Sequence, residues 1–308
     1  MLSVIFPTYN EEGNVLELHA RLKKTLDTIG EPYEIIASEG PSTDNTLPLL
    51  KSLSPIKIIV FVKKMGQAAA LNEGIRQAQG DIVVLLDADL QNSPEDIPKM
   101  LERLREGYDS VSGWRKNRHD PLHRKLLSRF ANALTSRVVG VELHDFSSPF
   151  KVCRKEAFRN IMLYGEMHAF VPAIFHAHGF KITEVPVEHS ERRSGKTKYS
   201  SLKVAKIFTD LMVVKFFSDY FARPLLFFGG WGLVSMFLGF VAGVVAIVLK
   251  FMGLWTFTQT PLPVLAALFI IVGVLLVMMG FLAEILFRIY YENKGRTPYI
   301  VKEVLENK

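Results

Sequence analysis

The stretch that decides the fold is Asp81-Ile-Val-Val-Leu-Leu-Asp-Ala-Asp-Leu-Gln91. Its apolar run, residues 82–86, is unbroken, which is typical of a strand buried on both faces of a parallel sheet. Asp87 and Asp89 follow at the carboxyl end of that strand, where open α/β sheets bind ligands. Two carboxylates with open positions beside them suit Mg²⁺ or Mn²⁺ that bridges substrate phosphates. The alternative is a solvated loop that carries two acidic residues, and the remaining sequence favours the metal site.

Short apolar strands alternate with helices on both sides of this stretch. The predicted strands are residues 2–6, 33–37, 56–62, 82–86, 109–112 and 179–187. This alternation indicates a doubly wound α/β sheet with helices on both faces. No G-x-G-x-x-G follows the first strand, and no G-x-x-x-x-G-K-[ST] occurs in the chain. A dinucleotide-dependent dehydrogenase and a P-loop NTPase are therefore disfavoured.

The charge balance points to an anionic partner. The formal net charge is +6 and the isoelectric point is near 9.2, which fits nucleic acid, a phospholipid surface or a phosphorylated substrate. No nucleic-acid-binding motif is present, so we expect no nucleic acid partner. The single cysteine, Cys153, excludes an internal disulfide and a cysteine-based zinc site, and it fits a reducing cytoplasm.

Basic residues are concentrated after Gly113. Within fifteen positions the chain carries Arg115, Lys116, Arg118, Arg124, Lys125 and Arg129. Arg124 and Ser128 are four residues apart, so on a helix they share a face and suit one phosphate group. The alternatives are a solvated basic surface and a helix that lies on anionic lipid. Residues 191–199 add a second basic segment, predicted to be a mobile loop with a glycine hinge.

The last third of the chain predicts a membrane anchor. Residues 202–223 are amphipathic and indicate a helix in the headgroup plane, with an ordinary core helix as the alternative. Residues 224–249 and 251–283 carry no charge, and a spanning helix needs about 20 apolar residues. We therefore expect two transmembrane helices, near residues 225–249 and 263–287.

The flanking charges predict the orientation of these helices. The outer ends of the pair carry Arg223, Arg288, Lys294 and Arg296, whereas the connecting loop carries Lys250 alone. The positive-inside rule then puts the N-terminal part and the tail in the cytoplasm. The expected segments are a catalytic domain (1–200), an interfacial helix (201–223), two transmembrane helices (224–290) and a cytoplasmic tail (291–308).

Four motifs together resemble those of GT-A glycosyltransferases of family 2. They are Phe6-Pro-Thr-Tyr-Asn-Glu11, Ser42-Thr-Asp44, Asp87-Ala-Asp-Leu-Gln91, and Arg192 with Lys198-Tyr199. Within this family the chain is most similar to polyisoprenyl-phosphate glycosyltransferases of the dolichyl-phosphate mannose synthase and bacterial undecaprenyl-phosphate sugar transferase type. The resemblance implies a GT-A, Rossmann-like mixed sheet. It also implies metal-dependent, inverting sugar transfer from a nucleotide sugar to a polyisoprenyl phosphate, at the cytoplasmic leaflet of a bacterial inner membrane.

The resemblance also implies roles for individual residues. Those expected to bind the nucleotide sugar are Pro7, Tyr9, Glu11, Glu39, Asp87, Ala88, Asp89 and Gln91. Those expected to hold Mg²⁺ or Mn²⁺ are Asp87, Asp89 and Gln91. Those expected to contact the acceptor and the phosphates are Arg115, Arg124, Ser128, Lys151, Arg192 and Lys198. Lys151 stands where the family commonly has an arginine, so a point charge replaces a bidentate fork there.

The chemistry of the acceptor sets what the catalytic groups must do. A phosphate monoester has its second pKa near about 6, so the acceptor is mostly a dianion at neutral pH and needs little help from a base. It needs charge screening and alignment, and we therefore count Asp87 and Asp89 as catalytic through the metal they hold. Asp145 is the candidate for any assisting base, with a loop-capping role as its alternative.

One departure from the family pattern leaves a second function open. Relatives usually carry Asp-Asp-Gly-Ser after the second strand, whereas this chain has Glu39-Gly40-Pro41-Ser42. Either the nucleotide contact is remodelled, which the intact metal motif favours, or the protein is a catalytically weakened membrane scaffold that binds nucleotide sugar or lipid phosphate. A processive polysaccharide synthase would carry Gln-x-x-Arg-Trp and more membrane helices. The chain has neither feature, so chain extension is disfavoured. The relatives also indicate a homo-oligomer.

Overall fold

The computed structural model describes residues 1–116, 136, 140–159, 161–163, 165, 167–190 and 223–294. The chain divides into two compact units, Met1–Lys215 and Phe216–Lys308, and each is described by itself. The finer division into four segments stays a prediction. The predicted interfacial helix and cytoplasmic tail lie outside the described residues, apart from Arg223 and residues 291–294.

The first unit is built on a mixed sheet. Its described part has seven strands in the order β3-β2-β1-β4-β6-β5-β7. Their bounds are β1 (Leu2–Thr8), β2 (Tyr33–Glu39), β3 (Lys57–Val60), β4 (Ile82–Leu85), β5 (Ser110–Trp114), β6 (Lys151–Arg154) and β7 (Ile182–Pro186). All neighbouring pairs are parallel except those of β6, which runs antiparallel to β4 and β5. The predicted α/β fold with a mixed sheet is confirmed.

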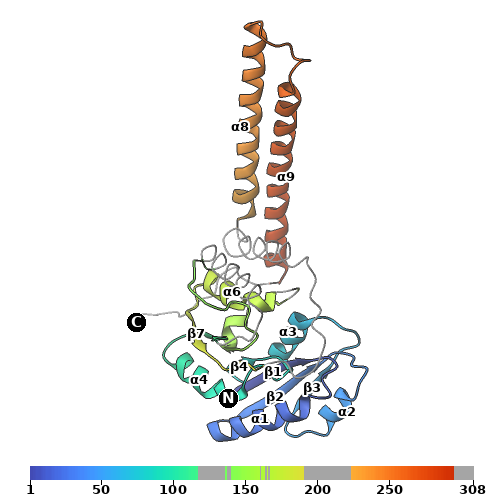
Figure 1. Cartoon of the computed structure of the whole chain (residues 1–308), viewed down its shortest axis with the longest axis vertical. Coiled ribbons are helices and arrows are strands. Elements are labelled where there is room, and N and C mark those ends of the chain that lie inside the picture. The colour runs from blue at the N-terminus through green and yellow to red at the C-terminus, as the bar shows by residue number, and fades with distance from the viewer. Residues whose placement is uncertain are drawn as a thin grey trace. The chain divides into compact units, whose positions relative to one another are not determined.

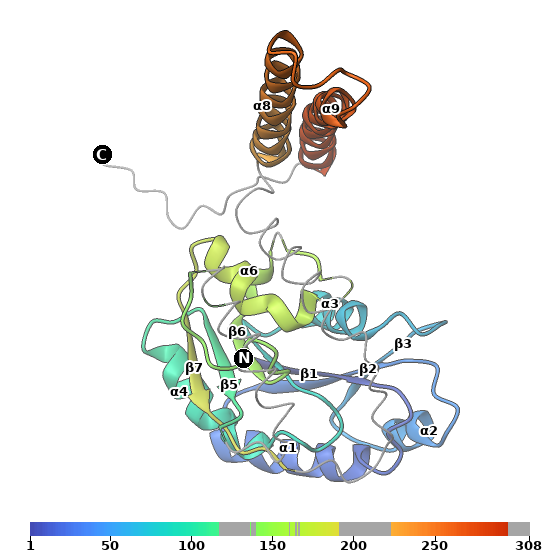
Figure 2. The same cartoon turned by 45° about the horizontal axis from the view of Figure 1, so that its top comes forward.

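Helices cover both faces of this sheet (Figures 1 and 2). Their bounds are α1 (Val15–Ile29), α2 (Thr46–Lys51), α3 (Gln67–Gln77), α4 (Ile97–Arg105) and α6 (Val171–Ala177). Apolar residues of α1, α2 and α4 pack with Val84 and Leu86 in one core, and those of α3 and α6 pack with Val83 and Leu85 in the other. The apolar run of β4 is therefore buried on both faces because alternate side chains enter different cores.

The strands β1 and β2 reach further than the sequence pattern predicts. β1 continues to Thr8 and β2 to Glu39, and these two residues are partners in the parallel ladder. Glu39 was expected in the loop after the strand, but the Thr8 hydroxyl donates a hydrogen bond to its carboxylate. The added pairing places Glu39 inside the sheet, where its side chain is fully buried.

The second unit is a pair of antiparallel helices, α8 (Pro224–Phe251) and α9 (Leu262–Lys294). The segments Pro224–Phe251 and Leu262–Phe287 are long and apolar enough to cross a membrane, by length and composition. Only 22% and 17% of the residues in their most apolar windows are buried, so most of these side chains are exposed in the isolated chain. The two helices cover both spans predicted from the sequence.

Candidate functional site

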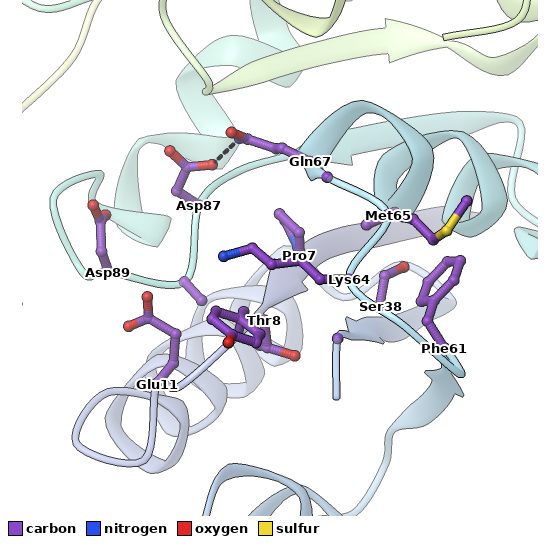
Figure 3. A pocket seen from close by; sticks show the side chains of 15 residues that line it. Pro7, Thr8, Glu11, Ser38, Phe61, Lys64, Met65, Gln67, Asp87 and Asp89 are labelled. Atoms are coloured by element: carbon purple, nitrogen blue, oxygen red, sulfur yellow. Dashed lines mark hydrogen bonds between the residues drawn. The ribbon is translucent and has the colours of Figure 1, made fainter. Parts of the chain in front are cut away.

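A pocket with a volume of about 310 Å³ lies at the carboxyl ends of β1, β2 and β4, beside the start of α3 (Figure 3). Its lining residues are Pro7, Thr8, Tyr9, Glu11, Ser38, Gly40, Phe61, Lys64, Met65, Gly66, Gln67, Ala70, Asp87, Ala88 and Asp89. These segments meet because the carboxyl ends of parallel strands share one edge of the sheet. Six of the residues predicted to bind the nucleotide are among them: Pro7, Tyr9, Glu11, Asp87, Ala88 and Asp89.

One end of the pocket is acidic. Asp87, Asp89 and Glu11 lie on the same side of it in Figure 3, and Gln67 Nε2 donates to Asp87 Oδ1 at 2.5 Å. Burial, followed by the negative charge of Asp89, raises the pKa of Asp87 to about 7. The positive charges of Lys151 and Arg115 act in the opposite direction. The site therefore holds a buried carboxylate, that of Asp87, whose negative charge the protein disfavours at neutral pH.

Asp87 and Asp89 suit a divalent cation whose remaining coordination positions are filled by water and substrate phosphates. Within residues 1–116 and the other described ranges, no three His, Cys, Asp or Glu side chains form a metal-binding group. Mg²⁺ usually binds through one or two carboxylates together with waters and substrate phosphates, so a two-carboxylate site beside an open pocket suits it. A cation would also relieve the repulsion that raises the pKa of Asp87.

Gln91, the third predicted metal ligand, lies beside this pair. Its backbone N–H donates to Asp89 Oδ1 at 3.2 Å, and its side-chain amide donates to the carbonyl of Ser190 at 3.5 Å. The Ser190 N–H in turn donates to the Gln91 carbonyl at 2.9 Å. The observed contacts of Gln91 thus orient Asp89 and connect it to residue 190, and direct metal ligation by Gln91 stays a prediction.

The other end of the pocket is aromatic and apolar. Phe61 and Met65 lie on the side away from Asp87 and Asp89 (Figure 3). Tyr9 also lines the pocket, and Lys64 Nζ lies 3.7 Å from the centroid of its ring. The Ser38 hydroxyl is fully buried and has no hydrogen-bond partner in the described part of the chain. An apolar wall with a few polar groups is typical of sites for planar organic ligands.

One segment of the pocket lining was not predicted from the sequence. Residues 61–67 connect β3 to α3 and supply Phe61, Lys64, Met65 and Gln67. The available signal was the dipeptide Gly66-Gln67, because Gly66 has φ of 86° and lets the chain turn into the helix. That signal locates the start of α3 but does not show which strand end it faces.

Glu39, which the resemblance implied to contact the nucleotide, is buried between the ends of β1 and β2. Its carboxylate accepts hydrogen bonds from the Thr8 hydroxyl and from the Ser42 N–H, the latter at 3.3 Å. The described lining of the pocket includes its neighbours Ser38 and Gly40 but not Glu39. In this conformation Glu39 joins the ends of β1 and β2, and a contact with nucleotide stays a prediction.

A second polar cluster contains Arg115 and Asp145. Arg115 Nε and Nη2 donate to the two carboxylate oxygens of Asp145 at 2.7 and 3.0 Å, and Nη2 also donates to Ser147 Oγ at 3.2 Å. Asp145 is only 2% exposed. A buried carboxylate held by a guanidinium fork is strongly oriented, so the geometry favours the loop role of Asp145 over the role of a base.

Of the remaining residues predicted to contact phosphate, one is described and four are not. Lys151 is 1% exposed, and its ammonium group donates to the carbonyl of Ser148. Burial lowers the pKa of Lys151 to about 8. The other predicted phosphate contacts, Arg124, Ser128, Arg192 and Lys198, lie outside the described residues.

Comparison with known proteins identifies the family. Residues 3–162 match glycosyl transferase family 2. The chain is 34% identical to the dodecaprenyl-phosphate galacturonate synthase of Rhizobium johnstonii over 321 residues, which covers 99% of this chain and 93% of the relative. It is 32% identical to the undecaprenyl-phosphate 4-deoxy-4-formamido-L-arabinose transferase of Proteus mirabilis over 311 residues, which covers 99% and 94%.

A solved structure supports the fold. Glucosyl-3-phosphoglycerate synthase from Mycobacterium tuberculosis, crystallised with Mn²⁺, UDP and glucosyl-3-phosphoglycerate, superposes with a TM-score of 0.54 over 71% of this chain and 79% of that chain. The sequence identity is 17%, so this likeness concerns the fold alone. With the family match and the full-length relatives, it shows that the chain belongs to glycosyl transferase family 2 and has a mixed sheet of the GT-A type.

Proposed function

We propose that this protein transfers a sugar from a nucleotide-diphosphate sugar to a polyisoprenyl phosphate, with inversion at the anomeric carbon. The observation that carries the proposal is a pocket that Asp87 and Asp89 line together with the aromatic side chains of Tyr9 and Phe61. Two relatives that match over nearly their whole length are named for dodecaprenyl-phosphate and undecaprenyl-phosphate chemistry. The two long apolar helices suit an enzyme whose acceptor is a lipid.

In this proposal the nucleotide sugar lies along the pocket, between its aromatic residues and its carboxylates. The base lies against Tyr9, Phe61 and Met65, and the diphosphate lies toward Asp87 and Asp89. Those two carboxylates hold Mg²⁺ or Mn²⁺, which when bound neutralises the diphosphate and makes the nucleoside diphosphate a better leaving group. The crystallised structural relative contained Mn²⁺ and UDP.

The acceptor phosphate is the nucleophile. One of its oxygens forms the new bond to the anomeric carbon while the bond from that carbon to the diphosphate oxygen breaks, and both electrons leave with the nucleoside diphosphate. Because the acceptor is already largely deprotonated, positioning and charge screening matter more than proton removal. Arg115 supplies positive charge in the described part of the site, and we propose Arg124, Ser128, Arg192 and Lys198 as further phosphate contacts.

Membrane placement brings the two substrates together. We propose that α8 and α9 span the bilayer, that residues 201–223 lie at its surface, and that the pocket is in the cytoplasm. The excess of basic residues outside the helix pair supports this orientation.

Loss of one carboxylate tests the proposal. In full-length, detergent-solubilised protein we expect one or more radiolabelled nucleotide sugars to yield a lipid-linked product with polyprenyl phosphate. Asp89→Asn should lower kcat/KM by at least about 100-fold, because it removes half of the anionic site. Asp81→Asn is the matched control, since Asp81 precedes the same strand and its side chain is 92% exposed. Unchanged turnover in Asp89→Asn contradicts the metal assignment, and nucleotide binding without any transfer favours the scaffold alternative.

A further inference from the structure

Lys151 lies in the sheet between two strands that each lead to a polar cluster. It is the first residue of β6 and is in register with Leu85 of β4 on one side and Ser112 of β5 on the other. Asp87 follows Leu85 by two residues, and Arg115 follows Ser112 by three. Lys151 therefore lies between the strand that leads to the acidic end of the pocket and the strand that leads to the Arg115 cluster.

The contacts of Lys151 lead to Arg115. Its ammonium group donates to the carbonyl of Ser148, a fully buried residue. Ser148 is in the loop that precedes β6 and that also carries Asp145 and Ser147, both of which accept hydrogen bonds from Arg115. One buried side chain thus connects the central sheet to the loop that orients the guanidinium group.

The charge of Lys151 is maintained by neighbours of opposite sign. Burying an ammonium group is costly unless carboxylates or carbonyls compensate it. Burial lowers the pKa of Lys151 to about 8, and the negative charges of Asp145 and Asp87 oppose this effect. Because the side chain is only 1% exposed, a phosphate in the pocket does not reach its ammonium group in this conformation.

We infer that Lys151 is a positioning residue for the transfer reaction. By holding the Ser148 carbonyl it keeps the loop at residues 145–148 in place, and that loop directs Arg115 toward the acceptor phosphate. Lys151 itself contacts neither substrate. The inference rests on the proposed function in one respect, namely that Arg115 faces the acceptor phosphate.

A purely structural role of Lys151 would have different kinetic consequences. If Lys151 only stabilised the core, its replacement would lower the amount of folded protein and leave the Michaelis constants of the folded fraction unchanged. A positioning role instead raises KM for the acceptor or lowers kcat, and it leaves KM for the donor unchanged. The two roles are therefore separable in steady-state kinetics of the full-length enzyme.

The kinetic test compares three variants. Lys151→Met removes the charge and the donor at similar length, and we expect kcat/KM for polyprenyl phosphate to fall by at least about tenfold, since a small misplacement of an aligning group has such an effect. KM for the nucleotide sugar should stay within about twofold. Cys153→Ala is the matched control, because Cys153 is buried two residues further along the same strand and contacts Ser110, not the loop.

Lys151→Arg should restore most of the activity. Arginine can also donate to the Ser148 carbonyl. Two nearby buried hydroxyls, those of Ser112 and Ser148, have no partner within the described part of the chain and can accept its additional N–H groups. Loss of activity in Lys151→Arg equal to that in Lys151→Met, or an equal loss in Cys153→Ala, would overturn the inference.

A double-mutant cycle tests whether the effect passes through Arg115. In an Arg115→Gln background, Lys151→Met should change kcat/KM by no more than about twofold, because the group it positions is already absent. If the losses in kcat/KM of the two single variants were additive in the double variant, Lys151 would act independently of Arg115. That result would contradict the inference.

Hydrogen exchange of the substrate-free protein provides a readout that does not depend on transfer. We expect Lys151→Met to raise deuterium uptake in peptides that cover residues 144–150, with uptake in β2 unchanged and with Cys153→Ala resembling the wild type. If the wild type showed no transfer, the proposed function would fail, and this measurement would then decide the inference alone. Unchanged uptake at residues 144–150 would overturn it, and raised uptake would support it.

Discussion

Just beyond the end of β4, Asp87 is buried beside a second carboxylate, that of Asp89. Burial and the charge of Asp89 raise the pKa of Asp87 from 3.8 to about 7. The folded protein therefore keeps a proton on Asp87 at pH values where the unfolded chain has released it. The contribution of this proton to stability is largest below about pH 4 and is lost as the pH rises toward about 7. Near neutral pH and above, ionisation of the buried Asp87 beside Asp89 therefore destabilises the ligand-free protein. Carboxylates with such perturbed pKa values are common at functional sites.

We predict that Asp87→Asn separates stability from activity. The amide keeps the shape of the side chain and removes its charge, so the variant without divalent cations should unfold at a temperature at least about 2 °C higher than the wild type at about pH 8. The difference should shrink at about pH 5, where Asp87 of the wild type is protonated. Sugar transfer should be lost. Thermal unfolding in detergent with EDTA measures the first effect, and a wild type more stable than Asp87→Asn at the higher pH would contradict the argument.

The pair α8 and α9 is held by close backbone contact. A Cβ atom on Gly232 would lie 2.7 Å from the carbonyl oxygen of Gly273, and one on Gly239 would lie 2.8 Å from that of Ala266. Ser235, between these glycines, donates a hydrogen bond to the Phe269 carbonyl at 2.7 Å. Small residues at such positions allow apolar helices to approach closely, and in lipid this packing replaces the hydrophobic driving force.

Two glycines that lie two residues apart in α8 allow a direct test. Gly232→Val should force the helices apart and destabilise the pair, at a cost of about 1–3 kcal/mol, because the opposing atom is backbone and cannot rotate away. Gly230→Val should be close to neutral, since a Cβ there meets no described atom within 4 Å. The yield of folded protein in detergent and its unfolding temperature measure the difference. Equal effects of the two substitutions would show that the contact is not important.

The charges around the helix pair determine the orientation that we propose for the whole molecule. Lys250 is the one basic residue in the segment between the apolar runs, whereas residues 191–223 and 288–296 are rich in lysine and arginine. Basic residues close to spanning segments are retained in the cytoplasm. The first unit, which contains the pocket, is then on the side where nucleotide sugars are found.

Cysteine labelling tests this orientation. The native Cys153 is buried, so it contributes little background. Thr258→Cys, in the exposed loop between α8 and α9, should react with a membrane-impermeant maleimide on cells whose outer barrier is permeable to it. Lys51→Cys, exposed in α2, should react only after the cells are lysed. The reverse pattern would place the pocket outside the cytoplasm and contradict the proposal.

The predictions from sequence were most accurate where the signal is local. The unbroken apolar run that leads to Asp87 and Asp89 determined a strand buried on both faces, because alternate residues of a central strand enter different cores. The uncharged runs after residue 223 determined two long apolar helices, because length and composition alone set that property. The resemblance implied that Pro7, Tyr9 and Glu11 line a pocket. They lie among the lining residues because the first strand ends there.

What the sequence left undecided depends on contacts between residues far apart in the chain. Only the tertiary structure showed that Phe61 and Lys64 line the pocket, because this requires β3 to lie beside β2 in the sheet. Only the ladder between β1 and β2 placed Glu39 against Thr8, where its buried carboxylate accepts a hydrogen bond from the Thr8 hydroxyl. Lys151 was expected from the resemblance to contact the acceptor and the phosphates, and it lies buried beside the Arg115 loop because β6 pairs with β4 and β5. Local patterns determine which elements form, and long-range pairing decides which side chains meet.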